Sequence, residues 1–220
     1  MSTQQTSAVV YSRGPWTDIT EGESILTTSG VNYQRYRVST NLGAEARLRV
    51  IGKGLGIERP HSPVIIFRYK QGDDHEGVIT FINPREGELD VLRTAAEHHQ
   101  SSSNLGATAI RPMKRGRSDV IDYSRPLCSD CIVVKEKLGN SGIIYQDSNV
   151  REDRDAQVLW RSICRGLDME EPRLPTVVFR HMGNAGEDDG FMIFVEPQGG
   201  ELKVMQAAIE YHRPSGRLET

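Results

Sequence analysis

Hydrophobic and polar positions in the second half of the chain follow two periods, which together predict the order strand, helix, strand, helix, strand, strand, helix. Short runs rich in β-branched and aromatic residues predict strands, whereas apolar positions that recur every three or four residues predict helices. The predicted strands are residues 120–123, 142–145, 175–179 and 191–195, and the predicted helices are residues 128–138, 155–166 and 200–212. The helix at 155–166 is amphipathic, because Leu159 and Ile163 share one face and Arg161 and Arg165 the other.

The first half of the chain repeats this pattern. An offset of 112 residues takes Tyr11-Ser12-Arg13 to Tyr123-Ser124-Arg125 and Gly54-Leu55 to Gly166-Leu167, and one residue is then gained in a predicted hairpin loop. A repeat this long indicates two complete domains rather than solenoid units. The expected boundaries are 6–100 for the first domain, 101–117 for a polar linker and 118–220 for the second domain. The predicted strands of the first domain are residues 9–11, 31–38, 64–68 and 78–82, and its predicted helices are residues 17–28, 44–54 and 88–99.

Composition and charge exclude several classes of protein. The 220 residues include 27 Lys and Arg against 30 Asp and Glu. We therefore do not expect the protein to bind nucleic acid through a large net positive charge. No run approaches the roughly 18 apolar residues of a membrane span, and we expect no membrane partner. The N-terminal residues have neither a basic start nor an apolar stretch, and three cysteines are too few for a disulfide-stapled secreted scaffold, so we expect a cytoplasmic protein.

Two of the three cysteines form the motif Cys128-Ser129-Asp130-Cys131 between a predicted strand and a predicted helix. This element order, with a proline opening the third strand, resembles the thioredoxin fold. The run from Tyr123 through Pro126 to Cys131 and the run Leu174-Pro175-Thr176-Val177 resemble the glutaredoxin branch of that superfamily. The resemblance implies an α/β protein with two tandem glutaredoxin-like domains, each with a central mixed four-stranded sheet flanked by helices. It also implies that Pro175 is cis.

The resemblance further implies a dithiol thiol–disulfide oxidoreductase that reduces protein or low-molecular-weight disulfides. Cys128, near a helix N-terminus that lowers thiol pKa values, is the predicted nucleophile, and Cys131 is predicted to resolve the mixed disulfide. The residues expected to contact the substrate thiol are Arg125, Pro126, Leu174 and Pro175. We expect no tightly bound cofactor and no metal; glutathione or an equivalent thiol is the candidate reductant. Gly199-Gly200 departs from the family pattern, however. Glutaredoxins that use glutathione have two glycines just after the fourth strand, whereas here the two glycines come later in the chain and follow Pro197.

Three alternatives stay open at this point. The two cysteines could bind zinc together with two imidazoles from His98, His99, His181 or His212, although His99 and His212 match across the repeat and are more simply helix-surface histidines. A nucleobase deaminase would need His-x-Glu, where the chain has His98-His99-Gln100. The third alternative is a non-enzymatic interaction protein with vestigial or zinc-binding cysteines.

The remaining cysteine and the first domain are expected to play no part in thiol exchange. Cys164 is predicted to be a small buried side chain. In the first domain Trp16 and Ile19 stand where the second has Cys128 and Cys131, so this domain cannot perform exchange by the same route. The first domain would instead hold substrates or stabilise the two-domain protein by packing against the second domain.

Overall fold

The computed structural model describes residues 5–14, 20–58, 60–71, 75–100, 117–182 and 189–213. The first half comprises β1 (Gln5–Ser12), α1 (Glu21–Thr28), β2 (Tyr33–Arg37), the 3₁₀ turn η1 (Val38–Thr40), α2 (Leu42–Leu55), β3 (Val64–Gln71), β4 (His75–Ile82) and α3 (Glu86–Gln100). The second half comprises β5 (Arg117–Ser124), α4 (Ser129–Asn140), β6 (Gln146–Asn149), α5 (Arg154–Gly166), β7 (Thr176–Met182), β8 (Gly190–Val195) and α6 (Gly199–His212). The predicted order is confirmed in both halves.

The strands form one mixed sheet of eight, in the order β2-β1-β3-β4-β8-β7-β5-β6. Each half contributes four neighbouring strands, and β4 joins β8 by antiparallel pairing that sets Thr80 opposite Ile193. The α/β class is therefore confirmed, but the expectation of two separate four-stranded sheets is wrong. The physical reason is that β8 is buried along its whole length, and a strand apolar on both faces is unstable as an exposed sheet edge.

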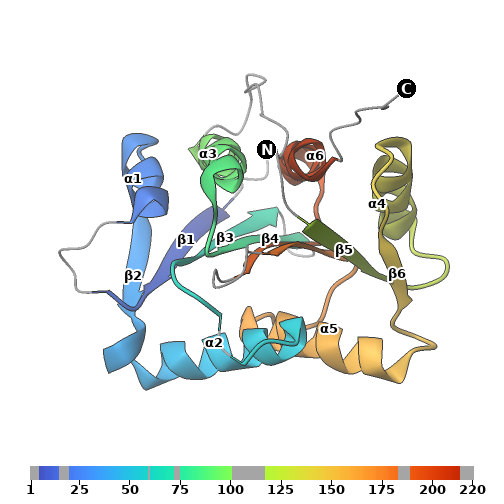
Figure 1. Ribbon diagram of the computed structural model, residues 1–220, viewed down its shortest axis with the longest axis horizontal. Helices are drawn as coiled ribbons and strands as arrows, with labels where there is room; N and C mark the ends of the chain where they lie inside the picture. Colours follow the sequence, from blue (N-terminus) through green and yellow to red (C-terminus); the bar gives the residue numbers. More distant parts are fainter. Residues whose placement is uncertain are drawn as a thin grey trace.

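Helices cover both faces of this sheet (Figure 1). Helices α1, α3, α6 and α4 lie on one face, and α2 and α5 lie on the other. Each face has its own hydrophobic core, and each core draws residues from both halves: Phe67 and Phe179 belong to one, Ile66 and Val178 to the other. The two halves thus share their cores as well as their sheet.

Helices α2 and α5 approach each other closely through two reciprocal glycine contacts. A side-chain carbon added at Gly54 would lie 2.6 Å from Cγ1 of Ile163, and one added at Gly166 would lie 2.5 Å from Cγ1 of Ile51. The offset of 112 residues relates both members of each pair, so the interface repeats itself about an approximate two-fold axis. Glycine at these positions lets the two helix backbones touch.

Replacing Gly166 by alanine is expected to lower the free energy of unfolding by about 1–3 kcal/mol, as overpacking of a filled core does. The new methyl group would lie 2.7 Å from the backbone nitrogen of Ile51, which cannot move independently of α2. Gly139→Ala is the matched control, because nothing lies within 4 Å of the added carbon in α4. It should stabilise the protein by about 0.5–1 kcal/mol through helix propensity alone. Denaturant unfolding of both variants tests this, and a stable Gly166→Ala variant would contradict the close approach.

Two local expectations are corrected. The strand predicted at 142–145 lies at Gln146–Asn149 instead, because 142–145 connects α4 to the sheet: Gly142 turns the chain with a φ of 74° and Ile144 is 91% exposed. His212 is not a helix-surface residue. It is buried and stacks on Phe179, since α6 packs against β7.

Several expectations fall outside the described residues. These include Trp16, Ile19 and the linker apart from Arg117, the first residue of β5. Among the described helices, none is long and apolar enough to cross a membrane.

Candidate active site

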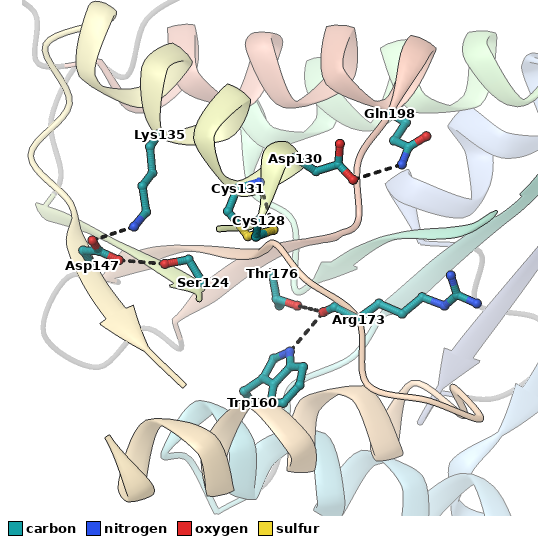
Figure 2. The surroundings of a disulfide bond; sticks show 10 residues. All are labelled: Ser124, Cys128, Asp130, Cys131, Lys135, Asp147, Trp160, Arg173, Thr176 and Gln198. Carbon is teal, nitrogen blue, oxygen red and sulfur yellow. Dashed lines mark hydrogen bonds and ion pairs between the residues drawn. A yellow bond between two sulfur atoms is a disulfide. The ribbon is translucent and has the colours of Figure 1, made fainter. Parts of the chain in front are cut away.

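Cys128 and Cys131 form a disulfide at the N-terminus of α4 (Figure 2), and their Cα atoms lie 5.2 Å apart. Cys128 is the N-cap of this helix, one residue before its first turn, and its sulfur accepts a hydrogen bond from the backbone N–H of Cys131 at 3.2 Å. The first N–H groups of a helix lack partners within the helix and carry the positive end of its dipole. The sulfur of Cys128 therefore lies where backbone N–H groups would stabilise a negative charge.

The two sulfur-bearing residues differ in accessibility. Cys128 is partly exposed, whereas Cys131 is 2% exposed. An incoming sulfur atom can therefore approach Cys128, whereas Cys131 is shielded from solvent. This asymmetry matches the predicted division of labour between an attacking and a resolving cysteine.

The loop before β7 carries two of the predicted substrate contacts. The Leu174–Pro175 bond is cis, as the resemblance implied, and so is the equivalent Ser62–Pro63 bond in the first half. The carbonyl of Arg173 accepts hydrogen bonds from Nε1 of Trp160 at 3.0 Å and from Oγ1 of Thr176 at 2.9 Å. In the view of Figure 2 this loop runs between the disulfide and α5, and the bond from Trp160 holds its backbone to that helix.

A pocket of about 480 Å³ opens beside the motif. It brings together three predicted residues, Arg125, Pro126 and Leu174, whereas Pro175 is buried and does not line it. The remaining lining residues are Leu127, Val150, Arg151, Gln157, Trp160 and Arg161. These come from the loop before α4, the loop after β6 and helix α5, so only the folded chain brings them together.

Asp122 is a candidate functional residue that the sequence reasoning missed. It lies on β5, is fully buried, and neither carboxylate oxygen has a hydrogen-bond partner among the described residues. Burial raises the pKa of Asp122 from 3.8 to about 7, and the nearby charge of Asp147 acts in the same direction while that of Lys135 opposes it. A signal was present: an acidic residue stands within the otherwise apolar strand around Val120 and Ile121.

The position of Asp122 relative to the motif follows from its neighbours. Lys135 follows Cys131 by one turn of α4, and its ammonium group lies 2.7 Å from a carboxylate oxygen of Asp147 on β6. Ser124, on the same strand as Asp122, donates to the other oxygen of Asp147 at 2.9 Å. Asp122 thus lies on the strand beneath α4, within the field of the charges of Lys135 and Asp147. Perturbed pKa values of this kind concentrate at functional sites.

Gly200, the second of the two glycines that depart from the glutaredoxin pattern, has a packing role. A side-chain carbon at Gly200 would lie 2.0 Å from the ring of His98 on α3, so glycine lets α6 pack against the first half. Gln198, the N-cap of α6, donates from Nε2 to a carboxylate oxygen of Asp130 at 3.4 Å. This contact connects α6 to the residue between the two cysteines.

The residues of the zinc alternative do not converge. The two sulfurs are bonded to each other, and no group of three or more metal-ligating side chains occurs among the described residues. The rings of His98 and His99 instead pack against Tyr69 on β3. Cys164 is a buried free thiol, as predicted, and burial raises its pKa from 9.0 to about 11.

Comparison of the chain with protein-family models, curated proteins and solved structures finds no match.

Proposed function

We propose that the second half is a thioredoxin-fold dithiol oxidoreductase of the glutaredoxin type, which reduces disulfides through Cys128 and Cys131. The observation that carries the proposal is the disulfide at the N-terminus of α4, in which only Cys128 is accessible. The element order of each half, its four-strand order and the cis proline before β7 support the fold assignment. We propose that the first half is a second unit of the same fold that covers β8 and α6.

The reduced protein would act in two balanced steps. The Cys128 thiolate attacks one sulfur of the substrate disulfide, a bond forms between the two sulfurs, and the other substrate sulfur leaves as a thiolate that takes a proton. The Cys131 thiolate then attacks the Cys128 sulfur, which releases the second substrate thiolate and forms the disulfide seen here. Two electrons pass from the protein to the substrate, and an external thiol reductant must return them.

The second step requires that Cys131 lose its proton while buried. Burial away from water disfavours a thiolate, so a nearby proton acceptor accelerates this step. We propose that Asp122 accepts the proton, because its pKa of about 7 allows both protonation states near neutral pH. Its carboxylate has no hydrogen bond to break among the described residues.

Trapping of a mixed disulfide tests the proposed function. Cys131→Ser removes the resolving thiol, so the reduced variant should accumulate a covalent adduct with a disulfide substrate through Cys128. Intact mass spectrometry after acid quench detects the adduct, and a reducing agent should release it. The wild-type protein, mixed in the same way, should return to the internal disulfide.

The alternative of an interaction protein with vestigial cysteines gives the opposite result. In that case Cys131→Ser forms no adduct, and the wild-type disulfide, once reduced, is not reoxidised by the substrate. Metal analysis of the reduced protein would find about one zinc per chain if the cysteines bind metal.

A further inference from the structure

The pocket beside Cys128 carries an unbalanced positive charge. Three of its lining residues are arginines, Arg125, Arg151 and Arg161, and none of its lining residues is acidic. Across the described residues, none of these three guanidinium groups forms an ion pair. Other arginines of the protein form ion pairs with carboxylates, as Arg173 does with Glu196 at 3.0 Å. A pocket with three unpaired guanidinium groups favours a ligand that carries more than one negative charge.

The residue at the mouth of this pocket is apolar and almost fully exposed. Leu127 directly precedes Cys128, is 98% exposed, and has a φ of 61°, in the left-handed region that leucine rarely adopts. This backbone conformation holds a large apolar side chain in solvent next to the attacking sulfur. A substrate chain that passed over Leu127 would remove this apolar surface from water, which favours binding.

We infer that the substrate is a protein segment that carries acidic side chains next to its disulfide-bonded cysteine. The inference rests on the proposed function and adds to it the class of substrate. The acidic side chains would occupy the pocket between Arg125, Arg151 and Arg161, and the backbone near the substrate cysteine would pass over Leu127. Attraction between opposite charges raises the rate of encounter and fixes which way the segment enters.

The uncharged residues that line the pocket suit a peptide chain. Trp160 and Leu174 supply apolar surface, and Gln157 supplies an amide that can both donate and accept hydrogen bonds. Because the Arg173 carbonyl is held by Trp160 and Thr176, the loop that carries Leu174 is fixed before the substrate arrives. Preorganisation of this kind reduces the entropy lost on binding.

Single-turnover reduction of three matched peptides tests the inference. Each is a disulfide-linked peptide of the same length, with aspartate, asparagine or lysine on both sides of the cysteine. Reduced protein is mixed with each peptide, the reaction is quenched with acid, and the released peptide thiol is measured by mass spectrometry. The second-order rate constant should be about tenfold higher for the aspartate peptide than for the asparagine peptide, lowest for the lysine peptide, and these differences should shrink with added salt.

Charge reversal assigns the preference to the pocket. The double variant Arg151→Glu/Arg161→Glu should favour the lysine peptide over the aspartate peptide. Arg165→Glu is the matched control, because Arg165 lies on the same helix as Arg161, is exposed and does not line the pocket. It should keep the wild-type order of the three peptides.

The experiment distinguishes failure of the proposed function from failure of the substrate inference. If the reduced wild-type protein reduces none of the peptides, the proposed function fails and the inference falls with it. If it reduces all three at equal rates, the function stands and the acidic substrate is overturned. If the protein also reduced glutathione disulfide as fast as the aspartate peptide and lost this rate in the double variant, the pocket would be assigned to a small thiol. That result would overturn the inference that the substrate is a protein segment.

Discussion

Replacing Cys128 by serine is expected to lower the rate of disulfide reduction by roughly a thousandfold or more, because a serine hydroxyl at neutral pH cannot replace a thiolate nucleophile. Cys128 is the partly exposed member of the pair, and the N–H groups of α4 stabilise its negative charge. Cys131, buried in the first turn, cannot take over the attack. The measurement is the rate at which reduced protein converts a small uncharged disulfide to thiol.

Cys164→Ala is the matched control for this loss. Cys164 is buried, and a thiol whose pKa is raised to about 11 is almost entirely protonated at neutral pH. The variant should keep the wild-type rate. If Cys164→Ala abolished reduction and Cys128→Ser did not, the assignment of the nucleophile would be overturned.

Local pattern was enough to predict the elements and the position of the motif. The strands and helices predicted from hydrophobic period and from glycine and proline positions occur in the predicted order in each half, although the strand predicted at 142–145 lies at Gln146–Asn149. The helix that carries the motif begins at Ser129, beside the predicted start at Cys128. These features depend on neighbours in sequence, which is why a sequence can show them.

The joining of the two halves was not predicted, although the sequence carried a signal for it. Phe191 to Val195 is apolar at every position, and a strand that ended a four-stranded sheet would expose one side of its backbone to water. Pairing with β4 removes both problems. The continuous apolar run is therefore the pattern of a central strand, with neighbours on both sides.

The pocket and the buried carboxylate lay beyond sequence reasoning for a different reason. Arg125, Arg151 and Arg161 come from three separate segments, and nothing in their spacing shows that they converge. On the helical pattern alone, Arg161 was indistinguishable from Arg165, which lies outside the pocket. The burial of Asp122 likewise depends on α4 covering β5, which is a tertiary contact.

Replacing Asp122 by asparagine is expected to stabilise the oxidised protein, and the gain should depend on pH. The pKa of Asp122 is raised from 3.8 to about 7, so the folded protein holds a proton there between these pH values that the unfolded chain has lost. Above pH 7 both states are ionised, and burying the charge costs up to about 4 kcal/mol. As the pH falls from 7 towards 4 this cost disappears. The asparagine variant should therefore exceed the wild type in free energy of unfolding at pH 8, and the two should converge near pH 4.

Denaturant unfolding at pH 4, 6 and 8 measures this difference. Asp119→Asn, the same change at a partly exposed position of β5, is the control for the substitution itself. If Asp122→Asn were less stable than the wild type at pH 8, the negative charge of Asp122 would stabilise the fold. This result would contradict the claim that burial of this unpartnered carboxylate destabilises the protein.

The same substitution should slow release of the reduced substrate, because an amide cannot accept the proton of Cys131. Removing a general base reduces a rate on the order of a hundredfold, and the loss should fall on the second step alone. Rapid acid quench would then show the mixed disulfide on Cys128 persisting in Asp122→Asn, while its formation proceeds at the wild-type rate. In the wild type the release rate should rise with pH through an inflection near 7, where Asp122 ionises, and this inflection should be absent from the variant. An unchanged release rate with the inflection retained would show that another group or a water molecule takes the proton, and that Asp122 affects stability only.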